Sequence, residues 1–354
     1  MDFITRPDAV LQDDLLIRAA AAAPSPDNAQ HWAFQVDQGV VSVVHRHSAA
    51  IDPFGPVGHA TLMGVGAMYE NVLQAAHAVG AGLPVWKPVP TERESGYFTF
   101  PLAHKASEGF EHLPLFQRHT NRFAFTKTPF SEDLLTSADV EHDATRLVCI
   151  SDTGGLGVAS RVARTCCEAR FCDRELHEWL MSSIRFTPGE VASGDGIDIA
   201  TIALPPGGAQ FMRFIRPWHR MATLNRFHAY KLMAQQEVMK LRNASTLICL
   251  VGESSSTGAL AAGVLMERAW IALNAAGWGV HPYYVIADQQ SRQDEGRGLP
   301  EWRDDIADAL GRLNKYLGLG QSERLHMVLR VGWPKRPSPP KSRRLPLAEL
   351  IHVT

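Results

Sequence analysis

Hydrophobic and polar positions along the chain form two kinds of pattern, one helical and one strand-like. Apolar residues recur at helical spacing over residues 8–23, 60–79, 131–139, 155–182, 210–240 and 256–276. Runs typical of strands occupy residues 31–36, 40–46, 146–150, 245–251 and 326–331, and the first two flank a hairpin signal, Asp37-Gln38-Gly39. Segment 83–102 is expected to be loop with an edge strand, and segment 187–209 to be irregular. The pattern predicts a protein of mixed helices and strands.

Two of the apolar helical segments resemble each other. GAMYENVLQAAHAVGAG, from Gly66, aligns with GVLMERAWIALNAAGWG, from Gly263, at a constant offset of 197 residues, with six identities in 17 positions. Their glycines and small residues predict a helix packed tightly on all sides and closed by a glycine cap. Two apolar helices can also resemble each other by composition alone. Because Glu70 and Glu267 fall in register together with three glycine pairs, we favour a duplication, which makes the chain a fused pseudo-dimer.

Length, composition and charge exclude several classes of protein. A chain of 354 residues is expected to hold two domains or one large domain. With 45% hydrophobic residues and a net charge of -2, it is typical of a folded globular protein and not of a nucleic-acid-binding protein that relies on phosphate neutralisation. No apolar run approaches the roughly 18 residues of a membrane span, and no secretory pattern is visible at the start. We therefore expect a cytoplasmic protein with no nucleic-acid or membrane partner.

The cysteines and several short glycine motifs do not define a site. Cys149 and Cys249 lie in apolar strand-like runs, where a thiol behaves as a small hydrophobe. The remaining three cysteines, Cys166, Cys167 and Cys172, form a CC-x4-C cluster that lacks zinc spacing, so packing is the expected role and their function stays open. The glycine run at 155–160 is one residue short of G-x-G-x-x-G, which argues against a dinucleotide site.

Three short segments carry candidate binding chemistry. They are APSPDNAQHW at 23–32, RHTNR at 118–122, and LRVGWP at 329–334 with Lys-Ser-Arg following at 341–343. In this order, with the duplicated helix between them, they resemble three motifs of the FMN-dependent nitroreductase-like flavoproteins: A-P-S-x-x-N-x-Q-P-W, R-[RH]-[ST]-x-[RK] and L-R-x-G-[YW]-P. The resemblance covers most of the chain except residues 185–240, and it is greatest to the fused, single-chain, Acg-like branch of that family.

This resemblance implies an α+β, nitroreductase-like fold made of two fused halves that form an intramolecular pseudo-dimer. Residues 1–110 are the first half and carry the P-S-x-x-N loop. Residues 111–354 are the second half and carry the R-x-T-x-R segment, a lid-like insertion at about 186–220 and a basic C-terminal tail. Each half is expected to be a mainly antiparallel sheet flanked by helices. Whether such chains pair further is left open.

The basic segments suit a phosphate group, which needs several converging donors. Arg118, Thr120 and Arg122 alternate along an extended segment, so their side chains can point the same way, and the resemblance adds His119 between them. In the tail, Arg343 can supply a bidentate fork and Lys341 a point charge. Taken alone, the first segment would be interpreted as a solvated strand edge and the second as a basic tail, in preference to a phosphate site.

Two loops suit the flavin ring. Ser25 and Asn28 offer a hydroxyl and an amide to the polar edge of the ring, while Pro24 stiffens their loop and Gln30 belongs to the same motif. The same residues are ordinary turn chemistry. The resemblance also places a loop near the flavin N5, here Pro282, Tyr283 and Tyr284, although the sequence departs from the family's P-x-E-G type at this point.

The distribution of motifs predicts one flavin site. Family homodimers build each site across the subunit interface, with the arginine segment and tail from one subunit and the P-S-x-x-N loop from the other. Here each half has only one of the two sets, so the resemblance implies one FMN per chain, bound between the halves.

The family's activity is a two-electron transfer from NAD(P)H through the flavin to a small organic acceptor, and no protein nucleophile or base is needed, so we expect an oxidoreductase with no catalytic side chain. Two alternatives stay open. A closed lid would make the protein an FMN-binding or FMN-sequestering protein without turnover. A flavin-dependent tailoring dehydrogenase or oxidase of a biosynthetic pathway is the other.

Overall fold

The computed structural model describes residues 11–46, 55–88, 96–136 and 145–353, and the strands there form two main sheets. The first sheet has the order β12 (Ile351–Val353), β1 (Trp32–Asp37), β2 (Val40–His45), β4 (Gly96–Pro101), β3 (Val85–Trp86). The second has the order β10 (Gly279–Tyr283), β11 (Glu323–Pro334), β9 (Thr246–Glu253), β6 (Arg146–Ile150), and β5 (Phe125–Thr126) pairs with β11. Every pair in these sheets is antiparallel except β1 with β12. The predicted α+β class with mainly antiparallel sheets is confirmed.

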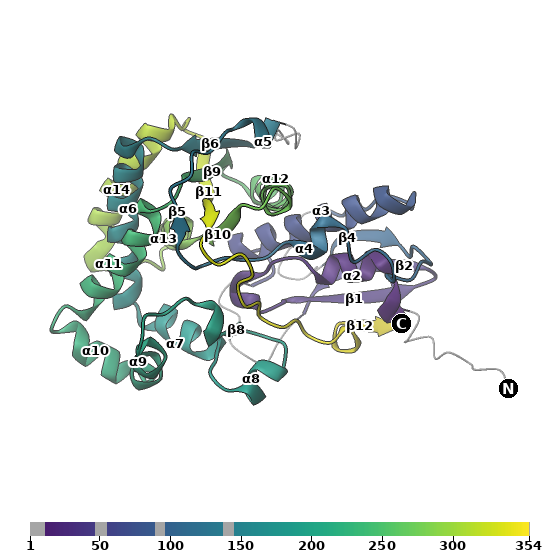
Figure 1. Ribbon diagram of the computed structural model, residues 1–354, viewed down its shortest axis with the longest axis horizontal. Coiled ribbons are helices and arrows are strands. Elements are labelled where there is room, and N and C mark those ends of the chain that lie inside the picture. Colours follow the sequence, from purple (N-terminus) through teal and green to yellow (C-terminus); the bar gives the residue numbers. More distant parts are fainter. Residues whose placement is uncertain (1–10, 47–54, 89–95, 137–144, 354) are drawn as a thin grey trace.

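Helices lie between and around the sheets (Figure 1). They are α2 (Leu15–Ala21), α3 (His59–Val79), α4 (Pro114–Gln117), α5 (Asp133–Thr136), α6 (Thr153–Cys172), α7 (Arg174–Ser183), α8 (Pro188–Ala192), α9 (Gly208–Ile215), α10 (Trp218–Asn225), α11 (Ala229–Arg242), α12 (Ser256–Ala275), α13 (Val285–Asp294) and α14 (Arg303–Leu317). Two short strands pair with each other, β7 (Ile184–Arg185), directly before the predicted insertion, and β8 (Ile197–Asp198), inside it. Helices α3 and α12 lie between the sheets, and one hydrophobic core joins them to both. A second core packs α6, α11 and α14 against the other face of the second sheet.

Most predicted elements are present, with several differences. The predicted helical region 210–240 is three helices, α9, α10 and α11, and segment 187–209, expected to be irregular, contains α8 and β8. The part of the predicted helix 131–139 from residue 137 on lies outside the described residues. The predicted helix 155–182 is two helices, because Asp173 leaves the helical conformation (φ -87, ψ 120) and caps α7 by accepting from the backbone N–H of Leu176. The stretch from 279 to 317, where the hydrophobic pattern predicted no element, forms β10, α13 and α14.

Helices α3 and α12 meet through the paired glycines of the repeat. A Cβ on Gly66 would lie 2.1 Å from the carbonyl oxygen of Leu260, and a Cβ on Gly263 would lie 2.2 Å from the carbonyl oxygen of Met63. Met63 and Leu260 are themselves separated by the repeat offset of 197, so the two contacts are equivalent to each other through the repeat. Such reciprocity is the mark of a two-fold related interface.

A polar pair on the same helices is reciprocal as well. Glu70 forms a bidentate ion pair with Arg268, with Oε1–Nε and Oε2–Nη2 distances of 3.0 Å each. At the repeat-equivalent positions, Asn71 faces Glu267 and lowers the pKa of its carboxyl group. Glu70 and Glu267 are therefore equivalent through the repeat, but Asn71 of α3 stands where α12 has Arg268.

The C-terminal tail links the two sheets. After β11 the chain crosses from the second sheet to the first, where β12 pairs in parallel with β1 and Phe34 is opposite Ile351. On the way, residues 341–345 pass the loop that follows α2. The backbone N–H of Leu345 donates a hydrogen bond to Gln30 Oε1 of that loop at 3.1 Å. This meeting point is where the candidate site lies.

Candidate functional site

The loop after α2 is held in an uncommon backbone conformation. Asp27, Asn28 and Gln30 have positive φ angles of 45°, 61° and 53°, a region that costs a non-glycine residue on the order of 1 kcal/mol or more. The Ser25 hydroxyl accepts a hydrogen bond from the backbone N–H of Gln30 at 3.0 Å and closes the loop. The carbonyl of Pro24 would lie 3.2 Å from a Cβ on Gly64, so the loop rests directly on α3. Three strained residues in one loop mark a segment whose shape is imposed by its surroundings.

The side chain of Asn28 joins three segments of the chain. Its amide nitrogen donates to the carbonyls of Gly196 and Arg343, both at 2.8 Å, and its oxygen accepts from Arg344 Nη1 at 2.6 Å. The Gln30 amide donates to the carbonyl of Gly194 at 3.0 Å. Both amides, which the sequence assigned to a flavin, are thus engaged with the protein's own insertion and tail.

Two guanidinium groups converge beside this loop. Arg118 Nη2 and Arg344 Nη2 donate to the same carbonyl, that of Ala22, at 2.9 Å and 3.2 Å. The Arg118 guanidinium also lies over the Trp270 ring, 4.5 Å from its centroid, and its side chain is only 6% exposed. Segments from both predicted halves of the chain therefore meet here.

A buried carboxyl group faces this pair. Glu267 Oε1 lies 2.7 Å from Arg118 Nε, and the glutamate side chain is fully buried. Burial raises the pKa of Glu267 to about 7, although Arg118, Arg344 and Asn71 lower it. In the sequence, Glu267 stands out only as part of the repeat, because nothing in its neighbourhood along the chain indicates that it lies beside the arginine segment.

The cations of the cluster outnumber the carboxyl groups that face them. Burial and the nearby Arg118 lower the pKa of Arg344 to about 9, with Glu267 acting in the opposite direction. Burial and Arg118 also lower the pKa of Lys341, and burial lowers that of His119, to which Lys341 and Arg118 contribute. Burial is the largest cause of each shift, and the contributions of Arg118 and Lys341 show that these basic groups lie close to one another.

The tail contributes Arg344 rather than the predicted Arg343. The Arg343 side chain is exposed, and only its carbonyl takes part, as an acceptor from Asn28. Lys341 is also exposed, but it lies close enough to Arg118 for the charge of that arginine, together with burial, to lower the pKa of Lys341. In an extended tail, neighbouring side chains alternate in direction, so only one of the two adjacent arginines can face the site.

The rest of the arginine segment lies near other charged groups. Arg122 lies near Asp27 and Glu237, which raise its pKa, while burial has the larger effect and lowers it. Asp27 in turn accepts a hydrogen bond from Trp179 Nε1 at 2.8 Å. Thr120, between the two arginines, is partly buried. The loop thus contacts the basic cluster through Asn28 and lies near Arg122 through Asp27.

The predicted residues in β10 and directly after it point elsewhere. The Tyr283 hydroxyl lies 3.1 Å from Cys167 Sγ on α6, and the Tyr284 hydroxyl lies 2.7 Å from His59 Nδ1 at the start of α3. Pro282 sits within β10 opposite Leu329. These side chains have partners of their own and do not join the basic cluster.

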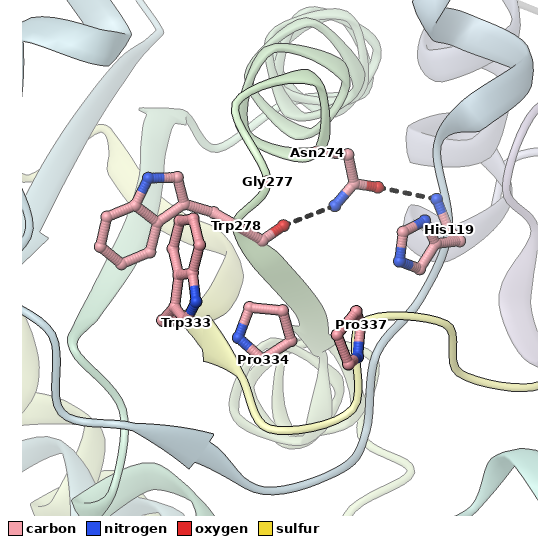
Figure 2. A pocket seen from close by; sticks show the side chains of 7 residues that line it. All are labelled: His119, Asn274, Gly277, Trp278, Trp333, Pro334 and Pro337. Carbon is pink, nitrogen blue, oxygen red and sulfur yellow. Dashed lines mark hydrogen bonds between the residues drawn. The ribbon is translucent and has the colours of Figure 1, made fainter.

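A pocket of about 260 Å³ opens beside His119 (Figure 2). It is lined by His119, Asn274, Gly277, Trp278, Trp333, Pro334 and Pro337. Asn274 fixes its wall by accepting from the His119 backbone N–H at 2.7 Å and donating to the Trp278 carbonyl at 2.9 Å. Small-molecule pockets usually measure about 300–1,000 Å³, so this pocket suits part of a ligand rather than a whole flavin.

The start of the predicted insertion packs against the loop and the tail. Gly194 has a φ of 83°, and a Cβ there would lie 2.2 Å from the carbonyl oxygen of Arg344. The backbone N–H of Asp198 donates to Ser342 Oγ at 3.1 Å. The insertion is therefore docked on the segments that form the candidate site.

Other kinds of site are not seen among the described residues. No group of three or more His, Cys, Asp or Glu side chains there could hold a metal ion, and the five cysteines are all free thiols. Burial raises the pKa of Cys172 to about 11 and that of Cys167 to about 12, so both thiols are protonated at neutral pH. No described helix is long and apolar enough to cross a bilayer.

Comparisons with known proteins give similarities of structure alone. No family model and no curated protein matches the sequence. Among solved structures, iodotyrosine deiodinase bound to FMN and 3-iodo-L-tyrosine is similar, with 16% identity, coverage of 65% of this chain and 92% of that chain, and a TM-score of 0.35.

Two nitroreductases are similar to the same degree. A nitroreductase from Sphingopyxis described as FMN- and NADPH-dependent gives 17% identity, 68% and 96% coverage, and a TM-score of 0.38. A putative NADH dehydrogenase/NAD(P)H nitroreductase from Parabacteroides distasonis has 13% sequence identity and a TM-score of 0.32, and the match covers 64% of this chain and 90% of that chain. At TM-scores below 0.5, none of these similarities assigns a family or an activity to this chain.

Proposed function

We propose that the chain is an FMN-dependent oxidoreductase of the nitroreductase type, with one flavin bound between two halves, 1–110 and 111–354, of an intramolecular pseudo-dimer. The observation that carries this proposal is the convergence of Arg118 and Arg344 on the loop around Asn28. These are the segments that the sequence motifs pair with a flavin, and they come from opposite halves of the chain. The reciprocal packing of α3 and α12 supports the pseudo-dimer.

The basic cluster has the composition that a phosphate dianion needs. Arg118 and Arg344 face one buried carboxyl group, Glu267, and Lys341 lies near Arg118, which together with burial lowers the pKa of Lys341 and of Arg344. A dianion would relieve the repulsion between these cations by forming charge-assisted hydrogen bonds with two guanidinium forks. The residues present therefore fit the phosphate end of FMN.

The remainder of the site would orient the ring. Arg122, next to Asp27, would face the polar edge of the ring and stabilise negative charge there. Ser25 and Pro24 shape the loop beneath it, whereas Asn28 and Gln30 would hold loop, insertion and tail together rather than contact the ring. FMN itself would supply the acceptance and donation of hydride.

The electron donor and the class of acceptor are part of the same proposal. We propose NADH or NADPH as donor and a small organic molecule, such as a nitroaromatic or a quinone, as acceptor. The test is stopped-flow mixing of the FMN-loaded protein with each nicotinamide under anaerobic conditions. Rapid bleaching of the flavin absorbance, followed by reoxidation on adding an acceptor, supports the proposal. A bound flavin that stays oxidised with both nicotinamides contradicts turnover.

One observation favours a second candidate, an FMN-binding protein without turnover. The insertion donates or accepts several hydrogen bonds at the loop and the tail, including those from Asn28 and Gln30 to the carbonyls of Gly196 and Gly194. If this docked position persists with flavin bound, the insertion excludes nicotinamide from the ring. The same stopped-flow experiment separates the two, because this candidate predicts a bound flavin that neither nicotinamide reduces.

A further inference from the structure

Glu267 and Glu70 occupy equivalent positions of the repeat but pair with arginine in different ways. Glu70 accepts two hydrogen bonds of 3.0 Å from Arg268 in a bidentate pair. Glu267 approaches Arg118 through a single 2.7 Å contact, and the Arg118 Nε–H is not directed along it, so the two form an ion pair without a regular hydrogen bond. The second pair is geometrically weaker although it is the more deeply buried.

The weaker pair lies in the basic cluster. Arg118 is fixed from two other directions, by its hydrogen bond to the Ala22 carbonyl and by the Trp270 ring. Its guanidinium is therefore positioned whether or not Glu267 is charged. An anion that arrives at Arg118 and Arg344 meets the Glu267 carboxyl group at the same cations, and two negative groups so close together repel each other.

We propose that Glu267 competes with the flavin phosphate for Arg118, so that FMN binding is coupled to the uptake of about one proton by Glu267. The inference rests on the proposed FMN site and adds its dependence on pH. When the phosphate binds, the carboxylate takes a proton from solvent and becomes neutral. The neutral group no longer repels the dianion, and Arg118 is free to donate to phosphate oxygens.

The groups around Glu267 set the pH range of this coupling. It faces Arg118 from the arginine segment, Arg344 from the tail, and Glu70 and Asn71 from α3. Burial outweighs the two arginines and, with a smaller contribution from Glu70, raises the pKa of Glu267 to about 7. The carboxyl group is then half ionised near neutral pH before the flavin binds. Arg344, with a pKa lowered to about 9, stays cationic through this range.

Because FMN binding requires Glu267 to be protonated, the affinity for FMN should fall as the pH rises. Below pH 7 Glu267 is neutral and the phosphate binds without competition. Above pH 7 the carboxylate must first be protonated, so the Kd for FMN rises by at most about tenfold per pH unit, or about 20-fold between pH 6.5 and 8.5. The phosphate is already largely a dianion at pH 6.5, because its second pKa is near 6. Riboflavin lacks the phosphate and should bind with little dependence on pH.

The experiment measures FMN and riboflavin binding to the apoprotein by fluorescence quenching from pH 6.5 to 8.5. We expect Glu267→Gln to bind FMN with a Kd that changes less than about threefold over this range and is lower than that of the wild type at pH 8.5. The matched control, Glu70→Gln, should keep the rise in Kd, with its midpoint at lower pH because one nearby negative charge is gone. Calorimetry in two buffers of different ionisation enthalpy should give about three quarters of a proton taken up per FMN in the wild type at pH 7.5.

The outcomes separate this inference from the proposed function. A wild-type Kd for FMN that does not change with pH, together with no proton uptake, overturns the inference and leaves the flavin site standing. An unchanged pH dependence in a folded Glu267→Gln variant also overturns it. Failure of the wild-type protein to bind FMN at any pH contradicts the proposed function itself. The proton count needs no variant and decides the matter even where Glu267→Gln does not fold.

Discussion

Gly66 of α3 and Gly263 of α12 face each other so closely that a Cβ on Gly66 would lie 3.0 Å from the Cα of Gly263. Each glycine also lies against a backbone carbonyl of the other helix, in the reciprocal manner described above. Backbone contact of this kind leaves no room for any side chain at either position. The two helices hold the two sheets together through this contact, so the stability of the whole chain depends on it.

Alanine at either glycine should therefore destabilise the protein. The added methyl group would overlap a backbone carbonyl that cannot move without shifting a helix, and overpacking of this kind costs about 1–3 kcal/mol or more. The gain in helix propensity, about 1 kcal/mol, does not compensate. Urea unfolding followed by circular dichroism measures the difference. Gly311→Ala in α14 is the control, because nothing lies within 4 Å of its Cβ position and it should be stabilising. Equal stability of Gly66→Ala and Gly311→Ala would refute the close contact.

The same two helices show which parts of the fold the sequence could predict. Their long apolar runs and paired glycines predicted both their limits and their mutual resemblance. Helix α13 gave no such signal, because polar residues such as Asp288 and Gln289 are buried in it and interrupt the helical spacing. Helix α14 did carry a usable signal in the spacing of Ile306, Leu310 and Leu313, which are all buried.

Arg344 and Arg343 provide a matched test of the basic cluster. Arg344→Ala should weaken FMN binding on the order of 10- to 100-fold, because it removes a guanidinium whose hydrogen bonds to a charged group are worth about 1.5–3 kcal/mol. Arg343→Ala should change FMN affinity less than about threefold, because its side chain is exposed. Riboflavin affinity should be similar in both variants. Titration of each apoprotein measures these affinities, and a larger loss in Arg343→Ala would reverse the assignment.

Gly194→Ala should loosen the insertion from the tail. Its φ of 83° disfavours any side chain, and the added methyl group would overlap the Arg344 carbonyl. Amide hydrogen exchange over residues 193–198 should become faster by about tenfold or more, which corresponds to about 1.4 kcal/mol of local stability. Gly189→Ala, in the same insertion but with nothing within 4 Å, is the control. If the docked insertion blocks nicotinamide, Gly194→Ala should also speed flavin reduction. Unchanged exchange would show that the insertion is not held by this contact.

A chain of hydrogen bonds, in which every donor lies on the same side of its acceptor, connects α3 to the second sheet. His326 Nε2 donates to the Glu253 carbonyl at 3.0 Å, so its Nδ1 must accept from His59 Nε2 at 2.9 Å. His59 Nδ1 then accepts from the Tyr284 hydroxyl at 2.7 Å. Both imidazoles are neutral in this arrangement. Burial, with Arg324 adding to it, lowers the pKa of His326 to about 4 and that of His59 well below its ordinary value.

These histidines should make the protein sensitive to mild acid. The unfolded chain binds protons at the ordinary histidine pKa of about 6.5, while the folded chain does not until about pH 4, so the free energy of unfolding falls as the pH drops through this range. The loss is at most about 1.4 kcal/mol per pH unit for each histidine. The double variant His59→Gln, His326→Gln should show a smaller fall between pH 6.5 and 4.5. Parallel curves for variant and wild type in urea unfolding would contradict the neutral chain.

The candidate site shows where sequence reasoning stops. The loop, the arginine segment and the tail were predicted from their motifs, and Arg118 lies beside the loop as expected. The choice between Arg343 and Arg344 depends on the direction of an extended tail, which is set by the burial of Leu345 near Gln30 and is not readable from the basic run itself. The role of Asn28 was also beyond prediction, because its partners Gly194 and Gly196 come from the insertion, which the motifs do not cover.

The central claim is that a single composite site lies between the two halves of the chain. Isothermal titration of the apoprotein with FMN at pH 6.5 tests it most directly, with protein concentration determined independently. The account predicts one FMN per chain in the wild type and a strong loss of affinity in Arg344→Ala at unchanged stoichiometry. Two flavins per chain, or no binding by a correctly folded protein, would contradict it.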